Sequence, residues 1–297
     1  MYDLHVHSTD SDGKYSKVDL LEMARLKNIK VIAFCDHNSY KNLDNRIIKR
    51  EYEEKYHRKS DALIIPSIEI SAGSNKYRGI HILGYGLRNI KPIREAIDSV
   101  NIQNVRAIYK QIELINREYD IPITVQQVIK LAMKNNITSK DLEEALIYYG
   151  YIDTKSDMYK FTNRNSKSHV DKVKISDIDS IKVIHKSGGI AILAHPIELK
   201  RKIDGTSLGY GEEYENYIEY LLSNGLDGVE THTIKHNAQQ QAIYYKIANK
   251  YNLLTTAGTD FHDEKRTPQL GVAYNPNIFL KPLLIRIKEK NERGEER

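Results

Sequence analysis

Short apolar runs alternate with amphipathic stretches towards both ends of the chain. Runs suited to buried strands occur at 2–6, 31–35, 63–70, 80–85, 189–195, 228–231 and 253–258. The first amphipathic stretch follows Ser16, a residue type that favours the N-cap of a helix. Such alternation is typical of parallel βα units with right-handed crossovers, so it predicts an α/β fold closed as a barrel.

The pattern changes in the middle of the chain. Between residues 91 and 186 the apolar positions recur at the helical period, as Ile108 and Ile112 do. We therefore expect a barrel domain built from residues 1–90 and 187–297, interrupted by a helical, substrate-binding insertion over 91–186.

Composition narrows the class of protein. The 45 Lys and Arg residues exceed the 40 Asp and Glu residues by only five in 297, which fits an anionic substrate but does not predict duplex DNA binding. The single cysteine, Cys35, excludes an internal disulfide. No apolar run reaches the ~18–20 residues that span a bilayer, and a candidate metal motif stands where a signal peptide would lie. We expect a cytoplasmic protein with no membrane partner.

Histidines and acidic residues gather at the ends of the predicted strands. His5 and His7 lie two apart on an extended strand, so their side chains point to the same side. Six of the eleven histidines and three acids share such strand-end positions: His5, His7, His37, His81, His195, His262, Asp12, Glu69 and Asp260. Because active sites of βα barrels form at that edge, we expect these side chains to make one site.

Mixed imidazole and carboxylate donors suit Zn, Mn or Fe better than Ca or Mg. Nine donors exceed the needs of one ion, so we expect two or three divalent ions, with Glu69 as the favoured bridge. Clustered ions of this kind hydrolyse phosphoesters or amides. The nearby Asp36 is expected to orient a neighbour rather than to bind an ion.

At these residues the chain resembles the PHP family, named for its polymerase and histidinol phosphatase members. Six blocks in family order carry the resemblance: His5-Val6-His7 with Asp12, Asp36-His37, Glu69, His81, His195 and Asp260-Phe261-His262. The resemblance implies a distorted (βα)7 TIM-like barrel with a trinuclear metal site. It implies one ion on His5, His7, Glu69 and Asp260, a second on Glu69, His81 and His195, and a third on Asp12, His37 and His262.

The helical insertion resembles that of the standalone phosphoesterases that act on nucleoside 3′,5′-bisphosphates and on short RNA from its 5′ end. This branch implies hydrolysis by a metal-bridging hydroxide. The residues given catalytic roles are Glu69, Asp260, Asp36 and His195, with Asp260 or Asp36 able to protonate the leaving oxygen. The candidate phosphate contacts are Arg106, Arg201 and His236, and Lys235 and His232 are further candidates.

The insertion departs from the branch pattern, because Ser139, Lys140 and Asp141 stand where Arg and His are usual. Two alternatives therefore stay open. A histidinol-phosphate phosphatase, or another small phosphate-ester phosphatase, would use the same metal site but needs little beyond the barrel. A non-catalytic metal-binding regulatory module would lack some ligands, whereas all nine are present. The sequence does not determine the oligomeric state or the metal used in the cell.

Overall fold

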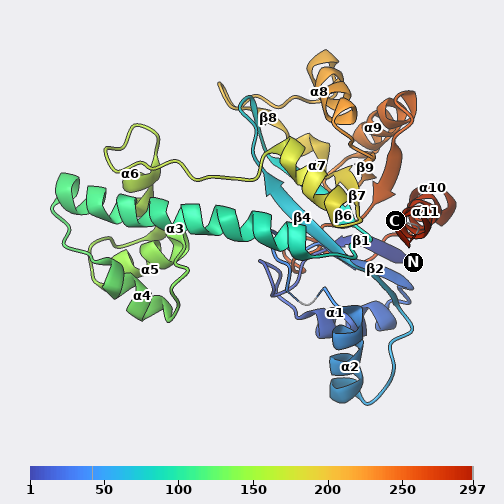
Figure 1. Cartoon of the computed structure of the whole chain (residues 1–297), viewed down its shortest axis with the longest axis horizontal. Helices are drawn as coiled ribbons and strands as arrows, with labels where there is room; N and C mark the ends of the chain where they lie inside the picture. The colour runs from blue at the N-terminus through green and yellow to red at the C-terminus, as the bar shows by residue number, and fades with distance from the viewer. Residues whose placement is uncertain (42, 296–297) are drawn as a thin grey trace. The chain divides into compact units, whose positions relative to one another are not determined.

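A computed structural model describes residues 1–41 and 43–295 (Figure 1). The chain divides into two compact units, the first formed by Met1–Glu95 with Ile175–Arg297 and the second by Ala96–Lys174. One boundary falls inside helix α3 (Lys91–Tyr119), and the other falls just before helix α7 (Asp177–Lys186). Helix α7, which we expected inside the insertion, therefore lies in the first unit, where it packs on β6 (Ile80–Tyr85) and β7 (Ile190–Leu193).

The first unit contains two main sheets. A parallel sheet has the order β1-β2-β3, with β1 (Tyr2–Val6), β2 (Val31–Phe34) and β3 (Leu63–Ile65). The other has the order β10-β9-β7-β6-β4, its remaining strands being β4 (Ser67–Ala72), β9 (Gly228–His232) and β10 (Leu254–Ala257). Two short strands, β5 (Tyr77–Arg78) and β8 (Lys200–Arg201), pair separately. The result is a mixed α/β fold.

Strand β6 does not follow the predicted parallel arrangement. It runs antiparallel to both β4 and β7, whereas the pairs β1–β2, β2–β3, β7–β9 and β9–β10 are parallel as expected. Only residues 73–79 join β4 to β6. A crossover between parallel strands needs a dozen or more residues, so this connection can only return the chain antiparallel.

The two main sheets share one hydrophobic core. Leu4 and Ala33 of the first sheet pack in the same buried cluster as Leu83, Ile192 and Ala257 of the second. Helix α1 (Lys17–Leu26) begins as predicted, because the Ser16 side chain accepts a hydrogen bond from the backbone N–H of Asp19. The other helices of this unit are α2 (Asn45–Tyr56), α8 (Glu212–Ser223), α9 (Ala238–Lys250), α10 (Pro276–Phe279), α11 (Lys281–Glu295) and the 3₁₀ turn η2 (Pro196–Glu198).

The second unit is helical. After α3 it contains α4 (Val125–Ala132), α5 (Ser139–Tyr148), the 3₁₀ turn η1 (Lys155–Met158) and α6 (Tyr159–Thr162). Its core includes Ile112, Val128 and Leu142. Thr138 and Asp141 form a capping box at the start of α5, so the segment that departs from the branch pattern is a helix start. Among the described residues, no helix is both long and apolar enough to cross a membrane.

Candidate metal centre

Two imidazoles and two carboxylates meet in the interior of the first unit. The Nε2 atoms of His5 and His7 lie 3.1 Å apart. Glu69 Oε2 lies 3.4 Å from His5 Nε2 and 3.2 Å from His7 Nε2. Asp260 Oδ1 lies 3.4 Å and 3.0 Å from the same two nitrogens. All four side chains are buried, so this group presents the donors predicted for the first ion.

Glu69 also faces a second group of histidines with its other oxygen. Oε1 lies 3.0 Å from both His81 Nδ1 and His195 Nε2, and these two nitrogens are 3.3 Å apart. His37 Nδ1 lies 2.9 Å from Oε2. Strand β4 thus directs one carboxylate between two groups, which is the arrangement expected of a bridging ligand.

A third group gathers around Asp12, in the loop after β1. Its Oδ1 lies 3.2 Å from His262 Nε2, 3.8 Å from His7 Nδ1 and 4.0 Å from His37 Nε2. His7 therefore faces the first group with Nε2 and this group with Nδ1, a shared position that was not predicted. The other oxygen of Asp12 pairs with Arg266 at 3.1 Å.

The electrostatics of these groups fit a bound cation. Burial raises the pKa of Glu69, but the surrounding histidines, His5 first, outweigh burial and hold that pKa well below its usual range. Burial lowers the pKa of His7, but the close carboxylates of Asp260 and Glu69 outweigh burial and raise that pKa to about 9. The buried carboxylate of Glu69 is thus ionised, and its negative charge favours a cation beside it.

Several buried atoms of the site have charged neighbours but no well-aligned hydrogen bond. In the described part of the chain, four atoms are in this position: His7 Nδ1, Glu69 Oε2, His195 Nδ1 and Asp260 Oδ1. A buried polar atom without such a bond costs about 1–3 kcal/mol, and metal coordination at that atom would remove the cost. Imidazole nitrogen with carboxylate oxygen is also a donor set that suits Zn, Mn or Fe. The nine predicted ligands are brought together, and their metal binding stays a prediction.

Two charged residues beside the site were given little or no weight from the sequence. Glu198, at the end of η2, places Oε2 3.3 Å from His195 Nδ1. Lys235 places Nζ 2.6 Å from Glu198 Oε1 and 2.5 Å from Asp260 Oδ2. The spacing of three residues between His195 and Glu198, across a turn, was the available signal. Lys235 thus neutralises two carboxylates, and its expected contact with phosphate stays a prediction.

The remaining predicted site residues lie apart from these groups. Asp36 accepts hydrogen bonds from the Ser8 backbone, the Ser8 hydroxyl and the Ser11 hydroxyl, and it pairs with Lys17 at 3.1 Å. It therefore anchors the loop that carries Asp12, which suits the orienting role more than a catalytic one.

The three predicted phosphate contacts have other surroundings. Arg201 pairs with Asp204 at 3.1 Å, and Arg106 lies on α3 in the second unit. His236 is buried and its Nδ1–H donates to the Thr231 carbonyl at 2.9 Å. Contact between these residues and a substrate stays a prediction.

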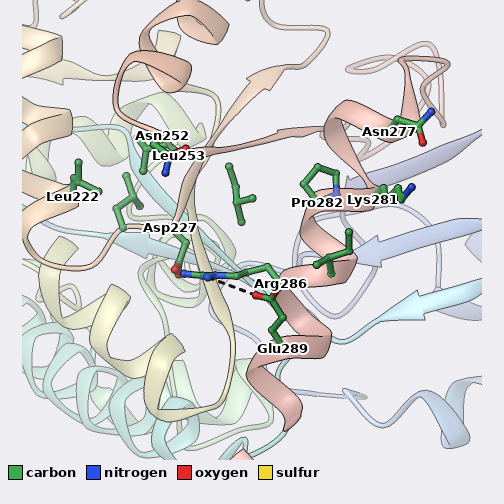
Figure 2. A pocket seen from close by; sticks show the side chains of 12 residues that line it. Leu222, Asp227, Asn252, Leu253, Asn277, Lys281, Pro282, Arg286 and Glu289 are labelled. Atoms are coloured by element: carbon green, nitrogen blue, oxygen red, sulfur yellow. Dashed lines mark ion pairs between the residues drawn. The ribbon is translucent and has the colours of Figure 1, made fainter. Parts of the chain in front are cut away.

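A groove of about 690 Å³ lies at the amino-terminal ends of β9 and β10 (Figure 2). Its lining includes Asp227, just before β9, Leu253, just before β10, and Arg286 of α11. Most of the candidate ligands, in contrast, lie near or beyond the carboxyl ends of the parallel strands. His81, expected at a strand end, lies instead at the start of β6, and it reaches the same site because β6 runs antiparallel to its neighbours. The groove is therefore separate from the metal centre.

No family model matches the chain, but curated proteins similar to it are named for cleavage of phosphate esters. The chain is 27% identical, over 97% of its length and 98% of the relative, to a 5′-3′ exoribonuclease of Haemophilus influenzae. It is 26% identical, over 91% of its length and 97% of the relative, to a phosphoribosyl 1,2-cyclic phosphate 1,2-diphosphodiesterase of Eggerthella lenta.

A solved structure shares the fold. It belongs to a protein of Bifidobacterium adolescentis assigned as a metal-dependent phosphoesterase. The TM-score is 0.65 at 22% identity, over 97% of this chain and 96% of the other. The curated relatives bear out the expected resemblance, on the side of the exoribonucleases, and the solved structure shows that the fold is shared.

Proposed function

We propose that the protein is a metal-dependent phosphoesterase that hydrolyses nucleotide phosphate mono- or diesters. The preferred substrates are a nucleoside 3′,5′-bisphosphate or a short 5′-phosphorylated oligoribonucleotide. The observation that carries the proposal is the convergence of nine imidazole and carboxylate side chains, with Glu69 shared between groups. Relatives that match the chain over nearly their whole length support it, since one is named for RNA cleavage and one for phosphodiester cleavage.

Two or three divalent ions, Mn, Zn or Fe, would be held by these groups. The ions would be distributed as the resemblance implies, with His7 added to the group of Asp12, His37 and His262. When bound, such ions lower the pKa of a water and stabilise negative charge on phosphate oxygens. Asp260 is suited to hold an ion rather than to give a proton. Burial raises its pKa, but the histidines around it, His5 first, hold that pKa well below the usual range.

We also propose that the two main sheets close into a distorted seven-stranded barrel. Strands β3 and β4 would count as one strand across Pro66. Two isolated β-bridges between the sheets support this closure. His37, after β2, pairs with Glu69 of β4, and Val6 of β1 pairs with Phe261, after β10. The helical unit over 96–174 would then be the substrate-binding insertion, and a cytoplasmic location stays a prediction.

The function is tested by phosphate release from matched substrates. Purified protein with Mn or Zn is given adenosine 3′,5′-bisphosphate, the same short RNA with a 5′-phosphate or a 5′-hydroxyl, a cyclic phosphodiester, and histidinol phosphate. We expect turnover of the bisphosphate or the 5′-phosphorylated RNA, and loss of activity with chelator and in Glu69→Gln. Faster turnover of histidinol phosphate would favour the small-phosphatase alternative. Bound ions with no turnover of any substrate would favour a regulatory module.

A further inference from the structure

Glu230 is a fully buried carboxylate of strand β9 that links two parts of the metal centre. Its Oε1 lies 3.0 Å from His5 Nδ1, and its Oε2 accepts the backbone N–H of His195 at 3.0 Å. Strand β9 lies between β7 and β10 in its sheet, so Glu230 stands beside the segment that carries His195. Its side chain also reaches His5, which is 225 residues away in sequence.

The contact with His5 determines which ring nitrogen is available to an ion. A carboxylate only accepts hydrogen bonds, so a neutral His5 must donate from Nδ1 to Glu230. The lone pair is then on Nε2, the atom that faces Glu69 and Asp260 at 3.4 Å. A carboxylate behind a metal-binding histidine is a common way to fix its tautomer and its ring orientation.

The contact with His195 acts on the backbone. His195 has φ 20° and ψ 66°, a conformation that residues other than glycine rarely adopt. Such conformations persist where neighbouring groups hold them, and the hydrogen bond to Glu230 is one such hold. From this backbone position the ring brings Nε2 to 3.0 Å from Glu69 Oε1.

We propose that Glu230 is a positioning residue that couples two of the ligand groups. One oxygen orients His5 in the group with His7 and Asp260, and the other holds His195 in the group with His81. None of the hydrogen bonds described for Glu230 reaches the group of Asp12, His37 and His262. Loss of the carboxylate should therefore weaken two ions together and leave the third. The inference rests on the proposed function only in requiring that ions occupy these groups.

Metal titration of Glu230→Gln tests the coupling. The amide keeps the size of the side chain but offers only one acceptor oxygen. If the NH₂ group of this amide faces His5, it donates to Nδ1 and so stabilises the tautomer of His5 that has its proton on Nε2. If the NH₂ group faces His195, it meets the backbone N–H of His195, and neither donor has an acceptor. We expect the first two ions to bind about 10- to 100-fold more weakly, with the third ion unchanged. Competition with a chromophoric chelator measures affinity, and elemental analysis after gel filtration measures stoichiometry.

Asp227→Asn is the matched control. Asp227 Oδ2 also bridges a histidine and a backbone N–H, lying 2.7 Å from His185 Nε2 and 2.9 Å from Ala191 N. It lies just before β9, at the end away from the metal centre. We expect this variant to lose stability but to keep wild-type stoichiometry. The coupling is overturned if Glu230→Gln keeps every ion at wild-type affinity, if it loses all ions while folded, or if Asp227→Asn loses the same ions.

A measurement on the wild type does not depend on a variant that folds. Long-range ¹H–¹⁵N correlation spectra of the zinc-loaded protein should show His5 protonated at Nδ1, and protonation at Nε2 would overturn the proposal. A wild-type protein that binds no ion would overturn both the coupling and the metal basis of the proposed function. Ions bound without phosphate release would overturn the proposed function alone.

Discussion

Gly258, directly after strand β10, lies against His5 of the metal centre, and its replacement by alanine should disturb that centre. The residue follows the last position of β10 and precedes the turn to Asp260. A Cβ atom at this position would lie 2.5 Å from His5 Cβ, 2.7 Å from His5 N and 3.1 Å from His5 Cα. Ordinary contacts of a Cβ atom are 3.4 Å or longer. The two segments must therefore move apart by about 1 Å.

This displacement has two costs. Overpacking in a close-packed interior costs about 1–3 kcal/mol of the free energy of unfolding. The movement also carries His5 away from Glu69, Asp260 and Glu230, to which its ring nitrogens are 3.0–3.4 Å distant. Metal–ligand distances tolerate only about 0.2 Å. We therefore expect affinity for the ion at His5 to fall at least about 10²-fold.

Urea unfolding and buffered metal titration measure the two effects separately. Gly211→Ala is the control, because nothing lies within 4 Å of its added Cβ and its φ is −88°. It stands at the N-cap of α8, where alanine costs less than about 1 kcal/mol relative to glycine. If Gly258→Ala matched this control in both stability and metal affinity, the close approach of β10 to His5 would be refuted.

Three further predictions concern other sites. Asp12→Asn should lower turnover at least ~10²-fold while changing the free energy of unfolding little, because Asp12 is 46% exposed; near-normal turnover with all ions retained would contradict its role as a ligand. Thr138→Ala removes the capping box of α5 and should destabilise the second unit by about 0.5–2 kcal/mol, which hydrogen exchange over 139–148 would detect. Burial lowers the pKa of His232 to about 4, below ~6.5 in the unfolded chain, so unfolding takes up a proton and stability falls as the pH drops from 6.5 towards 4. For this half-buried ring we expect a loss of about 1 kcal/mol between pH 7 and 5 by urea titration, absent from His232→Phe; equal losses in both proteins would contradict it.

The sequence predicted the donors of the candidate site better than their surroundings. His5 and His7 share a side because an extended strand repeats every two residues, and this holds in any fold. The prediction that the strand-end histidines and acids gather also agrees with the structure, since the ends of neighbouring strands lie at one edge. The phosphate contacts were weaker predictions, because an isolated Arg or Lys has no local pattern that separates a ligand contact from a solvated charge.

The direction of β6 and the positions of Glu230 and Glu198 beside the metal centre were not predicted. The apolar run at 80–85 has the same pattern in a parallel and an antiparallel strand, and only the short connection after β4 decides between them. Glu230 sits in an apolar run like any buried strand residue, and its partner His5 is 225 positions away. No local period connects such distant residues.

The sequence by itself determined which side chains could bind metal and which segments form the main strands, because hydrophobic periodicity and side-chain chemistry are local properties. It did not determine the bounds of every strand, since the run predicted at 63–70 is divided into β3 and β4. Only the tertiary structure decided how the donors are shared. It placed the two oxygens of Glu69 in different groups, made His7 common to two groups, and put Glu230 behind His5 and His195. These relations depend on which strands lie side by side, and that is decided by burial of the shared core of the two sheets.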